Sequence, residues 1–237
     1  MAGRVAYTGG IVRNGLVLNL DAAKRDSYPK TGTTWSDLSG NGNTGTLTNG
    51  PTYNSANGGS IVFDGTNDYI DCSNNSVLDI NQKQQTISFW FKTTQTSFGA
   101  YGTYLVSKIG TVRKWTYCLM MVPTGKIQFQ RDDGTNNPGI TTALSYNDGK
   151  WYNATVTNDG TIRIYINGVF VVSGTDTTVG STSNNNPLWI GSNGSNGGYT
   201  SAYFNGNISN VQIYNRALSA TEVLQNYNAS KSRFGLT

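Results

Sequence analysis

The chain has 237 residues, of which 13% are charged and 36% hydrophobic, and its formal net charge is +4. Its 14 Tyr, 8 Phe and 5 Trp can build an aromatic core, which excludes the aromatic-poor, highly charged composition of disordered chains. The 17 basic residues are scattered, whereas nucleic-acid binding usually needs a concentrated basic face, so we expect no nucleic-acid partner.

The pattern of apolar residues predicts many short strands in a single domain. Residues 1–14 show no such pattern and are expected to form an N-terminal arm, and alternating leucines over 16–20 predict the first strand. The turn-rich stretch 26–59 follows, and Trp35 and Leu38 are expected to pin it to the core. Further strands are expected at 60–65, 69–72, 86–91, 104–107, 115–122 and 126–131, three times within 151–174, and at 187–191 and 204–214.

The stretch 151–174 carries the strongest local signal. The pairs Asp159-Gly160 and Asn167-Gly168 separate three apolar runs, and such pairs supply the positive φ angles of type I′ turns. Between the two turns, every second residue of 162–166 is Ile. This alternation predicts an antiparallel meander that packs on one face.

One helix is expected, near the C-terminus. Ser219 and Glu222 are spaced as a capping box, in which each side chain bonds the backbone amide of the other. Val223, Leu224 and Tyr227 then share one face of a helix of about two to three turns, which should cover a sheet edge or end. About a dozen strands and one helix predict an all-β, two-sheet antiparallel sandwich.

No apolar run reaches the roughly 20 residues needed to span a bilayer, so we expect no membrane partner. The N-terminus also lacks the apolar core of about 7–15 residues that marks a secretory signal. We therefore expect either a trimmed signal or another way out of the cell, such as assembly into a virus particle that is released by lysis.

Five segments, in order along the chain, resemble the laminin-G-like jelly rolls of the concanavalin A-like lectin/glucanase superfamily. These segments are 15–22, 34–42, 61–70, 151–174 and 204–219. The resemblance implies a jelly-roll domain over 15–229, between the arm at 1–14 and a tail at 230–237. The amino-acid sequences of these segments are also similar to those of tailed-phage virion proteins. That similarity implies a place on the virion surface, as a capsid decoration, fibre or tail component.

The superfamily includes glycoside hydrolases, which normally use two carboxyl groups. This chain has one glutamate, Glu222, which the capping box already explains, and no histidine. The aspartate pairs Asp64/Asp68 and Asp132/Asp133 lie at expected turns, where Asp bonds its own backbone. We therefore expect that the protein is not an enzyme. A glycoside hydrolase is the least favoured alternative. The two cysteines, Cys72 and Cys118, could be buried free thiols or could form a disulfide, and the sequence does not decide between these two states.

Calcium is the one cofactor that the residues allow, because it needs only oxygen ligands. Asp64, Asn67 and Asp68 are weak candidate ligands, and the alternative is a turn held by their side chains. The pentraxin branch of the superfamily implies a calcium site near 114–115 and 191–197, but neither stretch contains a carboxylate.

Recognition of glycans is the remaining chemistry. By analogy with relatives, the loops 110–117 and 191–203 are expected to lie near each other at one rim. They supply aromatic rings for stacking and amides for sugar hydroxyls, namely Trp115, Asn193, Asn196, Tyr199 and Tyr203. The alternative is that Trp115 belongs to the core and that the Asn residues are ordinary loop residues.

The sequence favours a non-catalytic virion protein that contacts the capsid shell and host-surface glycans. An extracellular lectin module is the alternative. In the first reading the protein is a homo-oligomer, and 1–14 together with 228–237 are its contact segments. The expected location is the virion surface, which becomes extracellular after lysis.

Overall fold

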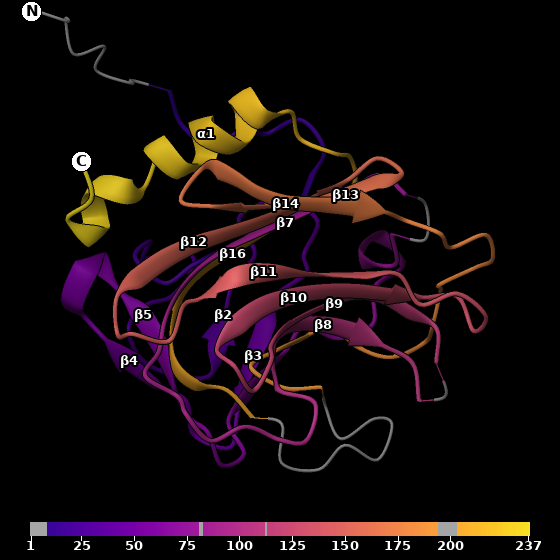
Figure 1. Ribbon diagram of the computed structural model, residues 1–237. Helices are drawn as coiled ribbons and strands as arrows, with labels where there is room; N and C mark the ends of the chain where they lie inside the picture. The colour runs from indigo at the N-terminus through magenta and orange to yellow at the C-terminus, as the bar shows by residue number, and fades with distance from the viewer. Residues whose placement is uncertain (1–8, 81–82, 112, 194–202) are drawn as a thin grey trace, which may run out of the picture.

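The computed structural model describes residues 9–80, 83–111, 113–193 and 203–237. Two antiparallel sheets of eight strands each face one another (Figure 1). Sheet I has the order β14-β13-β12-β7-β16-β5-β4, with β1 also paired to β16, and sheet II has the order β11-β10-β9-β8-β15-β6-β3-β2. This confirms the predicted two-sheet sandwich.

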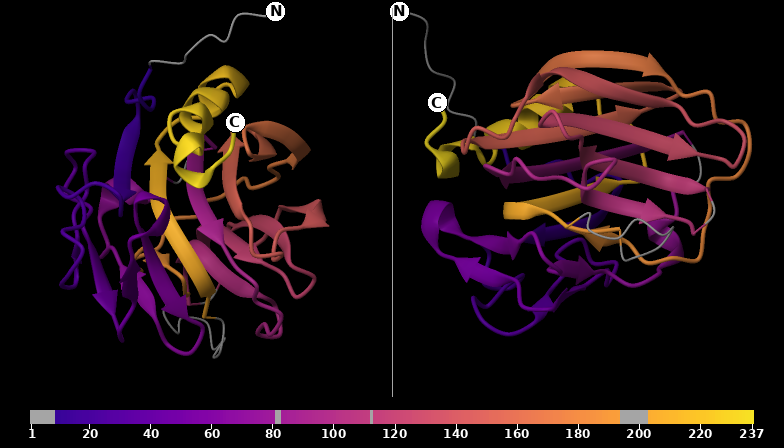
Figure 2. Two further views of the ribbon diagram at one scale, coloured as in Figure 1. Left: turned by 90° about the vertical axis from the view of Figure 1, so that its left-hand side faces the viewer. Right: turned by 60° about the horizontal axis from the view of Figure 1, so that its bottom comes forward.

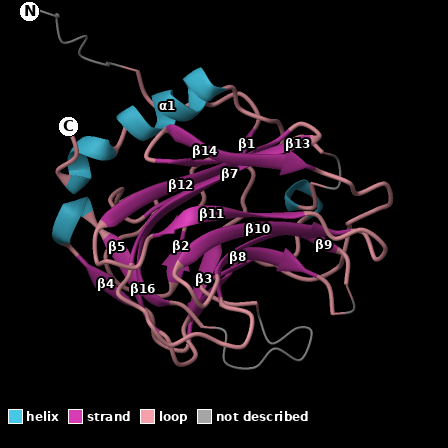
Figure 3. Ribbon diagram, viewed as in Figure 1, coloured by secondary structure: helices cyan, strands magenta, loops and turns pink. Residues whose placement is uncertain are grey.

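The strands of sheet I are β1 (Leu16–Asp21), β4 (Thr52–Asn54), β5 (Ser60–Asp64), β7 (Gln85–Lys92), β12 (Trp151–Asn158), β13 (Thr161–Ile166), β14 (Val169–Thr175) and β16 (Asn205–Tyr214). Those of sheet II are β2 (Thr34–Trp35), β3 (Gly45–Thr48), β6 (Tyr69–Asp71), β8 (Thr103–Ile109), β9 (Trp115–Met121), β10 (Lys126–Asp132), β11 (Gly139–Ser145) and β15 (Trp189–Ile190). The helices are α1 (Ala220–Asn228) and three 3-10 turns, η1 (Ala56–Gly58), η2 (Ser76–Leu78) and η3 (Lys231–Phe234). Figure 3 shows how strands dominate the regular structure.

The core fills the space between the two sheets. On β7, Ile87, Phe89 and Phe91 are fully buried and meet Leu119 and Phe129 from sheet II in one cluster. The alternate residues of β7 face the other way, as period-two patterning requires. The three isoleucines of β13 lie in the same cluster, which confirms the predicted meander.

The two turns of the meander differ. Asn167 and Gly168 have φ angles of 51° and 75°, as a type I′ turn requires. In the other turn only Gly160 has a positive φ, at 100°, and Asn158 pairs with Ile162 across a three-residue loop. The prediction of type I′ at Asp159-Gly160 was therefore wrong. The extra residue lets one glycine supply the left-handed conformation.

Several strands have no counterpart among the predictions. Strand β11 lies at an edge of sheet II, and only Thr142 among its seven residues is buried, so its apolar alternation is weak. Strands β2 to β4 lie inside the stretch 26–59, which was expected to be turn-rich and for which no strand was predicted. Within that stretch Trp35 is fully buried, as predicted, and Leu38 is half-buried.

Helix α1 lies on the outer face of sheet I (Figure 1), rather than at an edge or end as predicted. The capping box is present, and Val223 is buried as expected. Tyr227 stacks on Trp90 of the central strand β7, with ring centroids 5.6 Å apart. Leu224, however, is 44% exposed, so its assignment to the buried face was wrong. Asn226 is buried in its place, because it bonds the N-terminal segment.

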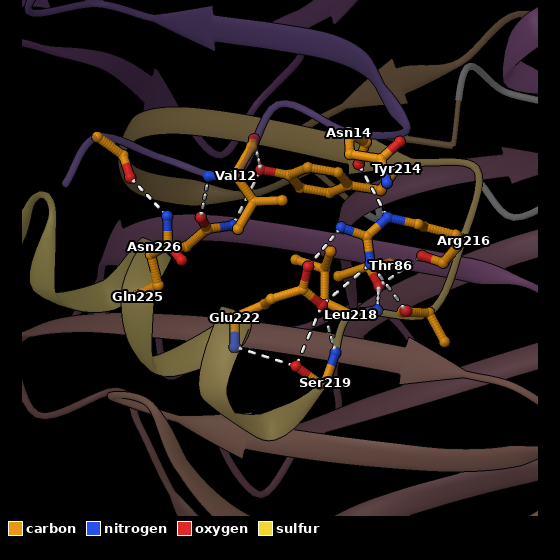
Figure 4. A network of polar contacts seen from close by, with 12 residues as sticks. Val12, Asn14, Thr86, Tyr214, Arg216, Leu218, Ser219, Glu222, Gln225 and Asn226 are labelled. Atoms are coloured by element: carbon orange, nitrogen blue, oxygen red, sulfur yellow. Dashed lines mark hydrogen bonds and ion pairs between the residues drawn. The ribbon is translucent and has the colours of Figure 1, made fainter.

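Both ends of the described chain pack on sheet I, side by side (Figures 1 and 2). The backbone amide of Val12 donates to Asn226 Oδ1 over 2.8 Å, and the Tyr214 hydroxyl donates to the Val12 carbonyl over 3.0 Å (Figure 4). At the other end, Phe234 stacks on Trp90 at 4.0 Å. Residues 10–14 and 231–234 thus belong to the packed domain, and 1–8 lie outside the described residues.

Both cysteines are free and buried. Burial raises the pKa of the Cys72 and Cys118 thiols well above the usual range, so both stay protonated and poorly reactive. The structure thus favours the free-thiol alternative. Within the described residues, no helix is long and apolar enough to cross a membrane.

Candidate functional site

The structure does not bring Trp115 and Tyr203 together. Trp115 pairs with Ile109 at one end of β8, is half-buried, and packs on a small apolar cluster outside the main core. The carbonyl of Tyr203 lies 3.4 Å from the Thr103 hydroxyl at the other end of β8. Six residues at about 3.3 Å each separate the two ends by roughly 20 Å.

The other predicted glycan residues fall into two groups. Asn193 follows β15 and is only 1% exposed, so its side chain is closed to solvent and cannot line an open site. Asn196 and Tyr199 lie outside the described residues. Of the three predicted residues that the structure describes, Tyr203 is the one that lines a groove.

That groove, here called the Tyr203 groove, has a volume of about 420 Å³. It lies where the loop after β7 meets the start of β16. It is lined by Gly65, Thr94, Gln95, Thr96, Ser97, Phe98, Tyr203 and Asn205. The Tyr203 ring is half-buried, and its hydroxyl makes no hydrogen bond among the described residues. The phenol can therefore stack on a ligand and bond it as well.

Gln95 fixes the shape of the groove. Its Nε2 donates to the carbonyls of Ser97 and Tyr203, over 2.8 and 3.2 Å, and to the Thr103 hydroxyl over 3.0 Å. Its Oε1 accepts the backbone amide of Asn205 at 3.1 Å. One carboxamide thus joins the loop after β7 to β8 and to the strand that follows Tyr203.

The turn with the weak calcium candidates borders the same groove. Asn205 Nδ2 donates to the Asp64 carbonyl over 2.9 Å. A Cβ at Gly65 would lie 2.8 Å from the Cβ of Asn205. This close approach, together with a φ of +78°, accounts for the glycine.

The carboxylates of this turn bond its own backbone. Asp64 Oδ1 accepts the Thr66 amide at 2.8 Å, and Asp68 Oδ2 accepts the Asp64 amide at 3.0 Å. The Thr66 amide holds the pKa of Asp64 below its usual value, and burial raises the pKa of Asp68. Among the described residues no group of three or more His, Cys, Asp or Glu could hold a metal. The side chains of Asp64 and Asp68 thus hold the turn, as the alternative expected, and calcium at Asp64, Asn67 and Asp68 stays a prediction.

The other candidate carboxyls also have structural partners. Asp132 pairs with Arg113 at 2.8 Å, and Asp133 accepts the amides of Val179 and Gly180 at 2.7 and 3.0 Å. Glu222 completes the helix cap. Its contact with Arg216 lowers the pKa of that carboxyl to about 2. Each of these carboxyls is held ionised by its neighbours and therefore lacks the raised pKa of a general acid.

The sequence analysis missed the loop 94–98 and Asn205. Their polar residues resemble those of any turn, and only the pairing of β7 with β16 brings them beside Tyr203. A usable signal was the placement of an aromatic residue, Phe98, directly after a run of Thr, Gln and Ser.

A family model described as Concanavalin A-like lectin/glucanases superfamily, Laminin_G_3, matches residues 64–224. The chain belongs to this superfamily. No curated protein sequence matches the chain. Many solved structures, however, share its fold.

One similar structure is the binding domain of Paraclostridial Mosquitocidal Protein 1, with a TM-score of 0.70 and 20% identity over 92% of this chain and 52% of that one. Another is Domain 4 of AbnA, a GH43 extracellular arabinanase from Geobacillus stearothermophilus, in complex with arabinotriose. It has a TM-score of 0.65 and 22% identity, and covers 90% of this chain and 98% of that one.

A third is the binding domain of Botulinum Neurotoxin DC in complex with SialylT, with a TM-score of 0.67 and 14% identity over 92% of this chain and 52% of that one. The jelly roll thus spans about half the length of the two toxin domains. At these identities the likeness shows the fold alone. None of these three structures is a phage protein.

Proposed function

We propose that this jelly roll is a non-catalytic, extracellular carbohydrate-binding module, and that the Tyr203 groove holds its glycan. The observation that carries the proposal is the Tyr203 ring, half-exposed and with a free hydroxyl, in a groove that is otherwise lined mostly by hydroxyl and amide side chains together with Phe98. Sugar rings stack on such aromatics, while hydroxyl and amide groups select the orientation.

The similar structures support this choice of class. Two of them were solved with bound saccharides according to their names, arabinotriose in one case and SialylT in the other. The proposal that the module lacks catalysis rests on the carboxyls described above, because each already has backbone or arginine partners. No observation favours a virion role. That role, the capsid partners and the homo-oligomeric state therefore stay predictions from the sequence resemblance.

A glycan array followed by calorimetry tests the proposal. We expect the wild type to bind at least one oligosaccharide, and Tyr203→Ala to weaken it about tenfold, the equivalent of about 1.4 kcal/mol. Tyr203→Phe should retain part of the affinity, because it keeps the ring and loses the hydroxyl. Trp115→Ala is the matched control at the opposite end of β8 and should bind normally.

Two results would contradict the proposal. Absence of binding to every glycan on the array would remove the lectin function. Release of reducing sugar from a polysaccharide would overturn the non-catalytic part while leaving the groove as a candidate subsite.

A further inference from the structure

A second pocket lies on the outer face of sheet I, over the pair β1 and β16. In this antiparallel pair Asn19 is opposite Gln212, and Asp21 is opposite Asn210. Opposite residues of an antiparallel pair project from the same face. Because Leu20, between Asn19 and Asp21, lies in the core, these four polar side chains point outward.

Three of the four are carboxamides without partners. Asn210 is 4% exposed and Gln212 is 6% exposed, and neither side chain makes a hydrogen bond within the described part of the chain. Asn19 Oδ1 is also buried with no partner. Of the side-chain atoms of these three residues, Asn19 Oδ1 is the one closed off from solvent without a partner. The amides of Asn210 and Gln212 therefore present unused donors and acceptors to whatever fills the pocket.

Two polar side chains on the outer face of the adjacent strand have partners. On the adjacent strand β7, the hydroxyl of Ser88 lies 2.8 Å from that of Thr155. Trp90 Nε1 donates to Ser230 Oγ over 2.8 Å. These outward-facing groups of β7 are thus paired, unlike those of β1 and β16, whereas the carboxamide of Gln85 at the start of β7 also lacks a partner.

The pocket itself has a volume of about 380 Å³. Leu38 and Ile11 contribute apolar wall, and the segment after α1 contributes Arg233. Arg233 forms a double hydrogen bond with Asp21, over 3.1 and 3.0 Å, so these two charges cancel. The floor thus carries carboxamides and one neutralised ion pair, while Arg13, Lys24 and Asp26 add charged groups to the walls. No aromatic ring is among the described residues that line the pocket.

We propose that this carboxamide pocket is a second binding site, which takes one polyhydroxylated unit such as a pyranose ring or a cyclic polyol. A carboxamide both donates and accepts hydrogen bonds, as a hydroxyl does. Cross-strand neighbours stand about 4.5–5.5 Å apart, a spacing that suits hydroxyls on alternate ring carbons.

The carboxamide pocket shares no lining residue with the Tyr203 groove. Asn205 and Asn210 lie on the same strand, five residues or about 17 Å apart. The inference therefore stands independently of the proposed glycan site, and the two can fail separately.

The test is NMR titration of the side-chain amides with myo-inositol and methyl hexopyranosides at millimolar concentration. In the wild type we expect the amide signals of Asn19, Asn210 and Gln212 to shift on titration. Gln212→Met, which keeps the shape but removes the amide, should weaken binding about tenfold or more. Tyr203→Ala should leave these shifts intact.

Stability gives an independent readout. Because the Gln212 amide has no partner, Gln212→Met should leave the melting temperature unchanged or raise it. The matched control is Gln128→Met on sheet II. Gln128 Nε2 donates to Thr141 Oγ1 over 2.8 Å, so this variant should melt lower and still bind the polyol.

Three outcomes would overturn the proposal. The first is no shift with any polyol or pyranoside, which would leave water as the occupant. The second is a fall in melting temperature for Gln212→Met as large as that for Gln128→Met, which would make the amide structural. The third is a response to acetamide, glycine or acetate but not to polyols, which would assign another ligand class.

Discussion

The buried pair of Arg131 and Asp176 joins the two sheets, and its removal should have the largest effect on stability. Arg131 lies on β10 of sheet II, Asp176 directly follows β14 of sheet I, and both side chains are 0% exposed. Arg131 Nη1 is 2.7 Å from Asp176 Oδ2, and Nε donates to the Thr116 carbonyl over 3.0 Å. Asp176 also accepts from Asn158 Nδ2 at 2.6 Å.

Arg131→Met keeps most of the apolar stem but leaves the Asp176 carboxylate buried without its cation. Breaking a buried pair in this way typically costs about 3–5 kcal/mol, and we expect a loss in that range. The double variant Arg131→Met/Asp176→Leu should recover most of it, because no charge then remains in the interior.

The pH dependence follows from the carboxyl. Burial pushes the pKa of Asp176 upward, but hydrogen bonds from Thr178 and Asn158 and the charge of Arg131 outweigh burial, and the net shift is downward. A depressed pKa contributes stability above the unfolded value of about 3.9, and this stability is lost as the pH falls through the folded value. The difference in unfolding free energy between wild type and Arg131→Met should therefore be largest at neutral pH and should shrink in acid.

Urea unfolding at several pH values measures these free energies by linear extrapolation. A cost below about 1 kcal/mol for Arg131→Met would refute the reasoning, because it would mean that the pair behaves like an exposed one. A double variant no more stable than Arg131→Met would also refute it.

Three further changes test other parts of the structure. Gln95→Leu removes the carboxamide that shapes the groove, so glycan affinity should fall about tenfold in calorimetry while unfolding loses only about 1–2 kcal/mol; unchanged affinity would contradict its positioning role. Glu222→Gln should cost about 1 kcal/mol at neutral pH. Because the folded pKa is depressed to about 2, that cost should fade in thermal melts as the pH drops from about 4.3 toward this value, and a cost independent of pH would be inconsistent with the cap. Gly191→Ala should cost about 2 kcal/mol or more, since φ is +83° and a Cβ would lie 2.6 Å from the Phe63 ring. Gly160→Ala, with a φ of +100° but open space, should lose about half as much in the same urea assay.

Elements with strong local signals were predictable. Alternation on β7 places Phe89 and Phe91 in the core, and the pair Asn167-Gly168 sets its own turn, because both effects act within a few residues. The capping box at Ser219 is local in the same sense. Edge strand β11 was not predictable, because a strand exposed on most of its residues has little apolar alternation.

The candidate site was predictable only in part. Tyr203 was named from its residue type, and the structure places it in a groove. Gln95 was not named, since two of its partners, Tyr203 and Asn205, lie more than 100 residues away along the chain. Trp115 was expected to share a rim with Tyr203, but the antiparallel pairing of β8 and β9 puts it at the other end.

The sequence by itself determined the fold class, the superfamily and the strands, turn and helix that have strong local signals, because periodicity, turn residues and caps are short-range properties of the chain. It also determined which chemistry is scarce, since one glutamate and no histidine can be counted directly. Only the tertiary structure decided where function could lie. The Tyr203 groove and the carboxamide pocket are each made by strands and loops far apart in sequence, and their shape and unpaired groups depend on sheet register and packing.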